Sequence, residues 1–206
     1  MGTNTAPAQI LFSEDGDLLV VSEKATNKLT AFHIDRFGYA FDPKICQSAG
    51  ATPFGPAFGR NHQLFVAEAN GGIANASSVS SYVLDEEQNE IMPISRSRFC
   101  TGQTAACWIV LTPDNRFAFV SNTDSNSISS YRISFSGGLT LSQSRAATTA
   151  AGPIDMTMSS DGRYLYALNR AGGSISQYQV GSDGRLTPMR NRLPALPTSA
   201  NGLAAR

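Results

Sequence analysis

Short stretches in which apolar and polar residues alternate recur along the chain, most clearly between residues 152 and 188. Residues 154–158 place an apolar side chain at every second position, the pattern of a β-strand with two unlike faces. The Asp161-Gly162 pair that follows is typical of a tight hairpin turn. Residues 164–168 are continuously apolar, which indicates a strand covered on both faces, and a third strand is expected over 175–180. A less regular fourth strand follows.

The same unit occurs three more times upstream, in residues 6–34, 53–84 and 105–133. Counted from turn to turn, successive units lie 46, 53 and 47 positions apart. A repeat of about 45–50 residues, with three clear strands and a weaker fourth, is typical of β-propeller blades. Each such unit leaves apolar faces that neighbouring units must cover. The four turns are expected at Asp15-Gly16, Arg60-Asn61, Asp114-Asn115 and Asp161-Gly162.

These repeats predict an all-β fold, a β-propeller of four-stranded antiparallel blades in one domain over residues 1–206. Four blades are followed by a segment that resembles the first strand of another blade. We therefore expect an arc that forms part of a larger ring. The expected blades cover approximately 6–50, 51–102, 103–149 and 150–192, with an extra strand over 198–206.

Composition and charge narrow the range of partners. The chain has 16 basic and 16 acidic residues, so no long-range field favours nucleic acid or an anionic membrane. The sequence has no apolar run of the roughly 18 residues that a membrane span needs, and its beginning lacks signal-peptide features, so we expect a cytoplasmic protein. The three cysteines are expected to be buried free thiols, with a Cys100–Cys107 pair as the alternative.

Several segments carry a resemblance to a known family. Residues 53–58 (PFGPAF), 64–69 (LFVAEA), 102–123 (GQTAACWIVLTPDNRFAFVSNT) and the ending GLAAR resemble the lactonase family of seven-bladed β-propellers. That family includes the propeller-type 6-phosphogluconolactonases and is similar to fungal carboxy-muconate cyclases. The chain resembles the C-terminal portion of these proteins. The resemblance implies hydrolysis of a sugar lactone such as 6-phosphogluconolactone, without a cofactor.

Candidate site residues follow from propeller geometry. In each blade the start of the innermost strand lies beside the end of the second strand, and these ends surround one mouth of the central channel. Loops there are held by a rigid scaffold, where binding groups concentrate. The residues expected at this mouth are Gln9, Glu23, Lys24, Phe54, Glu68, Trp108, Asn122, Asp155, Asn169 and Arg170.

Glu68 is the expected catalytic residue, because it ends the strand LFVAEA that resembles the family. A carboxylate in a partly apolar mouth can have a raised pKa and act as a general base on water. Glu23 is a second carboxylate of this kind and is expected to contact substrate. The alternative for both is a solvated or paired carboxylate at the rim.

Five further residues are expected to bind substrate. The amides of Asn122 and Asn169 would hold hydroxyls or the carbonyl oxygen, although Asn is also a frequent turn former. Arg170 would anchor an acid or phosphate group, or else is a surface charge. Trp108 would stack on substrate, or else packs in the core. Asp155 would line the mouth, or else caps a turn.

Two functions from different classes remain open. The first is a lactonase whose partner is a small lactone or sugar acid. The alternative is a non-catalytic propeller that binds a partner or small molecule, or an inactive fragment of a longer lactonase-family protein. His33 and His62 have no partner at metal-ligand spacing, so no metal site is expected. Uncovered blade faces would favour a homodimer.

Overall fold

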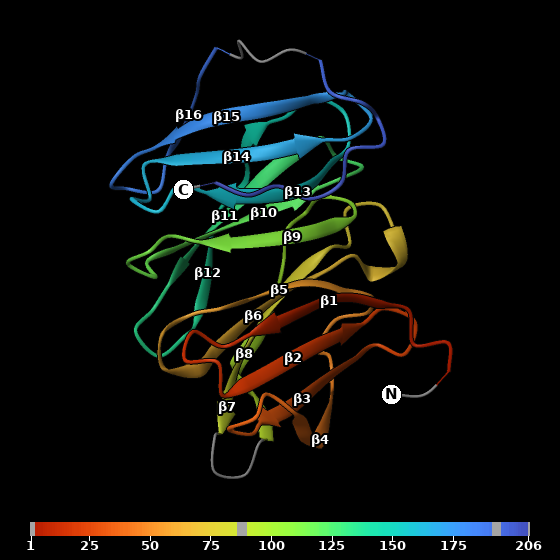
Figure 1. Ribbon diagram of the computed structural model, residues 1–206. Coiled ribbons are helices and arrows are strands. Elements are labelled where there is room, and N and C mark those ends of the chain that lie inside the picture. Colours follow the sequence, from red (N-terminus) through yellow and green to blue (C-terminus); the bar gives the residue numbers. More distant parts are fainter. Residues whose placement is uncertain (1–2, 86–89, 191–194, 206) are drawn as a thin grey trace.

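The computed structural model describes residues 3–85, 90–190 and 195–205. These residues form four antiparallel sheets of four strands each, and in every sheet the strands follow the order of the sequence (Figure 1). The all-β propeller architecture predicted from the repeats is confirmed. Each sheet is one blade, and its residues lie within the expected blade range.

Blade 1 consists of β1 (Pro7–Phe12), β2 (Leu18–Glu23), β3 (Lys28–Ile34) and β4 (Ala40–Gln47). Blade 2 consists of β5 (Pro53–Phe58), β6 (Gln63–Glu68), β7 (Ser78–Asp85) and β8 (Glu90–Cys100), with short 3-10 turns η1 (Arg60–His62) and η2 (Asn70–Gly72). Blade 3 consists of β9 (Ala106–Leu111), β10 (Phe117–Asn122), β11 (Ser127–Ile133) and β12 (Leu139–Thr148). Blade 4 consists of β13 (Pro153–Met158), β14 (Tyr164–Asn169), β15 (Ser174–Val180) and β16 (Leu186–Pro188).

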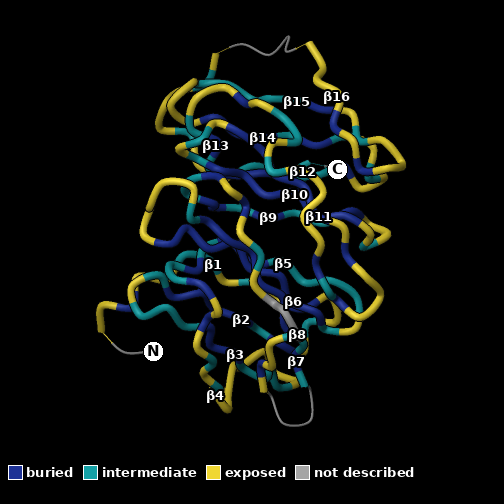
Figure 2. The backbone as a smooth tube through the Cα atoms, turned by 180° about the vertical axis from the view of Figure 1, so that it is seen from behind, coloured by how far each residue is buried: buried dark blue, intermediate teal, exposed yellow. Residues whose placement is uncertain are grey.

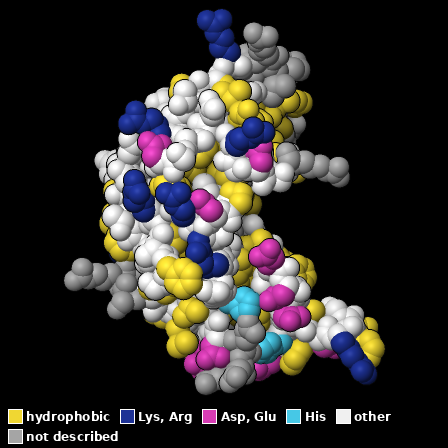
Figure 3. Space-filling model, turned by 90° about the vertical axis from the view of Figure 1, so that its left-hand side faces the viewer, with side chains coloured by type: hydrophobic (Ala, Val, Ile, Leu, Met, Phe, Trp, Pro, Cys, Tyr) yellow, Lys and Arg dark blue, Asp and Glu magenta, His cyan; other side chains and the backbone are white. Residues whose placement is uncertain are grey.

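The blades stack face to face in an arc. Their first strands, β1, β5, β9 and β13, contact one another in turn and form the inner side of the arc. Figure 1 shows the four sheets stacked one above another, and Figure 3 shows the crescent outline from the side that carries the hairpins between first and second strands. Buried backbone concentrates within the sheets, whereas exposed residues gather in loops and outer strands (Figure 2).

The predicted hairpin turns are all present between the first two strands of each blade. Gly16, Asn61, Asn115 and Gly162 have positive φ angles, as the turn pattern required. In three blades a Ser or Thr hydroxyl closes the turn by donating to an Asp two residues later. These pairs are Ser13–Asp15, Thr112–Asp114 and Ser159–Asp161.

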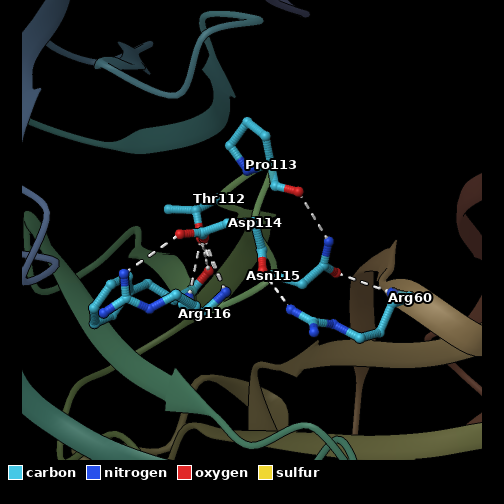
Figure 4. Close-up of polar contacts among 7 residues, drawn as sticks. Arg60, Thr112, Pro113, Asp114, Asn115 and Arg116 are labelled. Atoms are coloured by element: carbon cyan, nitrogen blue, oxygen red, sulfur yellow. Dashed lines mark hydrogen bonds and ion pairs between the residues drawn. The ribbon is translucent and has the colours of Figure 1, made fainter.

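Blade 2 lacks this hydroxyl and uses its neighbour instead. The Arg60 backbone amide donates to Asn115 Oδ1 at 3.0 Å, and the Arg60 guanidinium donates to the Asp114 carbonyl (Figure 4). On the other side, His62 Nε2 lies 2.9 Å from Asp15 Oδ2. The second hairpin therefore ties blade 1 to blade 3.

The core consists of three apolar clusters, one at each junction between blades. Leu18 and Val20 of blade 1 pack against Leu64 and Val66 of blade 2. The alternate residues of that second strand, including Phe65, face the other way and pack against blade 3. A third cluster joins blades 3 and 4. Because the second strands of the blades are covered on both faces, their sequences are continuously apolar.

Blade 1 presents its remaining face to solvent. The register aligns Ile10 with Val21, Thr30 and Ile45 across its four strands. Phe12 lies on the same face, and the exposed fractions of Ile10, Phe12 and Ile45 are 58%, 53% and 63%. A face of the kind that is buried at the three junctions is thus open here.

The predicted extra strand over 198–206 is wrong for the residues that the structure describes. Residues 195–205 contain a turn at 198–199 and no strand. Their hydrogen bonds go singly to blade 4, from the Leu196 amide to the Gly173 carbonyl at 2.7 Å and from Arg170 Nε to the Thr198 carbonyl at 3.2 Å. Pro197 also lacks the N–H that a regular ladder needs.

Candidate functional site

The inner side of the arc carries a groove of about 460 Å³. It runs along the first strands of the blades and over part of the first hairpin. Its lining is mainly apolar, and Glu14 is the one ionisable residue among the side chains that line it. The lining residues are Gln9, Leu11, Phe12, Glu14, Pro56, Ala57, Phe58, Trp108, Ile109, Val110, Leu111 and Met158.

Two polar features give the groove a chemical character. Trp108 is half-buried, lines the groove and also packs against the apolar cluster between blades 3 and 4. Gln9 Oε1 is buried and has no hydrogen-bond partner among the described residues. A buried acceptor without a donor is costly, by about 1–3 kcal/mol, and complete burial of this oxygen keeps it out of reach of a ligand in the groove. Exposed Glu14 lies at the hairpin end.

Glu68 lies apart from this groove, enclosed within blade 2. It has no exposed surface. Its carboxylate accepts hydrogen bonds from the hydroxyls of Ser48, Ser78 and Ser80, at 3.1, 2.5 and 2.6 Å, and from the Gly50 amide at 2.9 Å. Four donors and complete burial leave no place for a water to be activated. The geometry therefore gives Glu68 a structural role in place of the expected catalytic one.

The residues at the same position in the other blades are also buried. Glu23 accepts from Thr26 at 2.6 Å and from Thr30 at 3.0 Å. Asn122 donates to Ser129, and Asn169 donates to Ser176, each at 2.9 Å. These contacts lie within single blades, so the expected ring of polar groups facing one cavity is not assembled.

Arg170 and Asp155 lie at blade 4 beside the C-terminal segment. Arg170 is exposed and hydrogen-bonds the Thr198 carbonyl. Burial raises the pKa of the Asp155 carboxyl, which accepts hydrogen bonds from the backbone amides of Met156 and Leu203. Asp155 thus anchors the C-terminal segment to β13.

At the channel mouth the structure brings together a cation and an aromatic ring. The Lys24 ammonium lies 4.6 Å from the centroid of Phe54. Cys107 is buried nearby, its sulfur accepts a hydrogen bond from the Thr123 hydroxyl at 2.9 Å, and burial raises the pKa of its thiol. The three cysteines are free, as expected, but their expected burial is wrong for Cys46, which is partly buried, and for Cys100, which is exposed. Cys107 is buried and held in its neutral form.

Of the residues expected at the channel mouth, Trp108 and Gln9 line the groove. Sequence reasoning missed Glu14, Pro56 and Phe58, because it examined strand ends and not strand faces. For Pro56 and Phe58 the signal was available: the first strands alternate, and the residues on their inward faces line the channel.

Comparison with protein families decides the identity of the fold. Residues 76–199 match the model of the seven-bladed β-propeller family described as Lactonase. The chain belongs to the lactonase propeller family. The resemblance seen in the sequence is thereby confirmed for the family, and the similarity to fungal cyclases stays a prediction. No curated protein matches the sequence.

Solved structures of low sequence identity share the fold of this chain. A protein from Lactobacillus plantarum superposes with a TM-score of 0.79 at 17% identity, over 93% of this chain and 56% of its own. A candidate 6-phosphogluconolactonase from Bacteroides uniformis superposes with a TM-score of 0.76 at 16% identity, over 93% of this chain and 55% of its own. The periplasmic gluconolactonase of Pseudomonas aeruginosa superposes with a TM-score of 0.73 at 17% identity, over 89% of this chain and 56% of its own.

These identities show a shared fold and no more. The chain spans about 56% of the length of these structures. This is close to the fraction that four blades make of a seven-bladed ring. Within the described ranges, no helix is long and apolar enough to cross a membrane. One of the similar proteins is periplasmic, so the cytoplasmic location stays a prediction.

Metal-ligating side chains are dispersed over the arc. In the part of the chain that the structure describes, no three His, Cys, Asp or Glu side chains lie close enough together to hold a metal ion. The groove lining contains a single carboxylate, an amide and an indole as its chemical groups. Any reaction in the groove would rest on these groups.

Proposed function

We propose that the groove on the first strands binds a small lactone or sugar acid and that the chain has lactonase-like activity. The observation that supports this is the position of Trp108, Gln9 and Glu14 in one groove of a lactonase-family propeller. The groove volume of about 460 Å³ lies within the usual range for small-molecule sites. 6-Phosphogluconolactone is the substrate that the family resemblance suggests.

Each of the three residues has a distinct part in this proposal. The indole of Trp108 packs on the C–H face of the sugar ring. Gln9, which also lines the groove, offers its side-chain amide to a ring hydroxyl. Glu14 takes a proton from the attacking water as general base.

The chemistry needs no cofactor. The water oxygen bonds the lactone carbonyl carbon while its proton passes to Glu14. The ring C–O bond then breaks, and Glu14 returns the proton to the ring oxygen, which becomes a hydroxyl of the open-chain acid. Glu14 replaces Glu68 in this proposal because Glu68 has no exposed surface.

The test is lactone hydrolysis by Glu14→Gln, measured against the uncatalysed rate. Loss of a general base should lower kcat by about a hundredfold, with little change in KM. Asp17→Asn is the matched control, because Asp17 belongs to the same hairpin and does not line the groove. Equal activity of Glu14→Gln and the parent chain would exclude Glu14 as the base.

A non-catalytic binding module is the second candidate. The observation that favours it is that Glu14 is the sole ionisable group lining the groove, with no cation beside it to stabilise an oxyanion. Saturable lactone binding without any turnover above background would favour this function. Turnover that falls in Glu14→Gln would favour the lactonase.

A further inference from the structure

A cleft separate from the groove lies at the junction of blades 3 and 4, on the side of the arc that carries the hairpins between first and second strands. It has a volume of about 290 Å³. Unlike the groove, it is lined mainly by polar side chains from β11, β12 and the turn between β15 and β16. The side chains that matter for its chemistry are Ser130, Arg132, Thr140, Gln143, Asp183 and Arg185.

The cleft exists because the outer strands of the two blades differ in length. Strand β12 has 10 residues, whereas β16 has 3, so β16 covers only part of the face that blade 3 presents. On that face the register aligns Phe117 with Arg132 and Thr140 across three strands. The uncovered outer end of this row is polar.

Gly184 closes the inner end of the cleft. Its φ is +81°, and a Cβ at this position would lie 2.5 Å from the Phe117 ring. Glycine therefore allows the turn to pack directly on the ring. The space that remains opens towards Arg132 and Arg185.

Arg132 differs from three other arginines on this side. Arg116, Arg163 and Arg185 each have an aspartate two positions earlier, with N–O separations of 3.7, 2.6 and 4.0 Å. Among the described residues, no ion pair joins Arg132 to a carboxylate. Its guanidinium instead lies 5.4 Å from the Phe117 centroid. Its charge is thus available to a ligand.

Basic side chains outnumber acidic ones around the cleft. Figure 3 shows Lys and Arg side chains over the upper half of this side, where blades 3 and 4 lie, with a few acidic side chains among them, and Asp, Glu and His side chains over much of the lower half. Arg185 lies in the same cleft as Arg132, and its ion pair with Asp183 is long and exposed. Such exposed ion pairs contribute only about 0–1 kcal/mol of stability, so an anion can compete with Asp183 for Arg185.

We propose that this cleft binds the phosphate group of a small phosphate monoester. Guanidinium groups bind oxyanions in a bidentate manner, and the hydroxyls of Ser130 and Thr140 and the Gln143 amide can donate to the remaining oxygens. Asp183 selects the monoprotonated form of the phosphate group over sulfate, because a carboxylate accepts the proton of that form and repels fully ionised sulfate. Inorganic phosphate keeps this proton at pH 7, whereas a monoester carries it below its second pKa of about 6. The site is separate from the groove and independent of the function proposed there.

The test is isothermal titration calorimetry of the full chain with inorganic phosphate, and with sulfate at matched ionic strength. Arg132→Gln should weaken phosphate binding by at least about tenfold, the equivalent of one lost charge-assisted contact. Arg116→Gln is the matched control, since Arg116 lies over the same Phe117 ring at 5.3 Å but outside the cleft. It should change affinity by less than about twofold.

Selectivity gives a second readout. The parent chain should prefer phosphate to sulfate, and Asp183→Asn should remove most of that preference. Unchanged melting temperatures would show that the variants, all at exposed positions, remain folded. Equal losses in Arg132→Gln and Arg116→Gln, sulfate binding as tight as phosphate, or the absence of saturable heat would each overturn the proposal.

Discussion

The Glu68 carboxylate accepts a 2.6 Å hydrogen bond from the Ser80 hydroxyl across the β6–β7 pair. The same two positions are joined in the other three blades, by Glu23 with Thr30, Asn122 with Ser129 and Asn169 with Ser176. Each bond connects the end of a second strand to the third strand. The repeat thus places a buried side-chain hydrogen bond between the second and third strands of every blade, at the end of the blade that lies at the channel mouth.

Glu68→Gln should destabilise the fold. All four groups around the carboxylate are donors, and the amide would turn its own N–H₂ towards some of them. We expect the free energy of unfolding to fall by about 2 kcal/mol, measured by urea denaturation. Glu14→Gln, at an exposed position, should change it by less than about 0.5 kcal/mol. Equal stability of the two variants would show that the hydrogen bonds of Glu68 contribute nothing to the free energy of unfolding.

Acid should weaken the first hairpin through Asp15. The Ser13 hydroxyl and the Asp17 amide, with a smaller contribution from His62, lower the pKa of Asp15 from 3.8 to about 2. Because the folded pKa is the lower one, the ionised carboxylate stabilises the fold above about pH 4, and this contribution is lost between pH 4 and 2. Asp15→Asn should therefore melt below the parent chain at pH 7 and converge with it near pH 2. A difference in melting temperature that stays constant from pH 7 to pH 2 would show that the Asp15 carboxylate does not cause the acid sensitivity.

The open face of blade 1 should promote self-association. Phe12 and Ile45 are more than half exposed on a face of the kind that other blades bury. The double variant Phe12→Thr with Ile45→Thr keeps strand-forming residues and should weaken association by about tenfold or more. Light scattering over a concentration series measures this. Ile73→Thr is the control, since Ile73 is equally exposed but lies in the loop after η2.

The homodimer expected from the sequence stays a prediction that the same series tests. A chain that keeps the monomer mass at every concentration would contradict it. So would equal association of the double variant and Ile73→Thr, because the effect would then not belong to this face.

The fold could be predicted because local signals repeat. Gly16, Asn61, Asn115 and Gly162 mark the same turn in every unit, and the continuously apolar second strands show that both faces are covered. The segment over 198–206 carried no such signal. Its apolar residues suggested a strand, but pairing depends on a neighbour that the sequence pattern does not specify.

The site was harder to predict because a polar residue at a strand end has two possible surroundings. Glu68 was expected at an open mouth, but Ser48, Ser78 and Ser80 surround it, from positions up to 20 residues away. Trp108 lines the groove because its strand lies on the channel side, and its contact with a substrate stays a prediction. Glu14 was not considered, since a turn residue shows its proximity to the groove only in three dimensions.

The most direct test of the groove as the ligand site is the fluorescence of Trp108 during titration with gluconolactone or gluconate. Trp108 is the single tryptophan of the chain, so the signal comes from the groove lining alone. The account predicts a saturable change in emission, with weaker binding, by roughly tenfold, in Gln9→Ala. No saturable change with either compound, or the same affinity in Gln9→Ala, would contradict it.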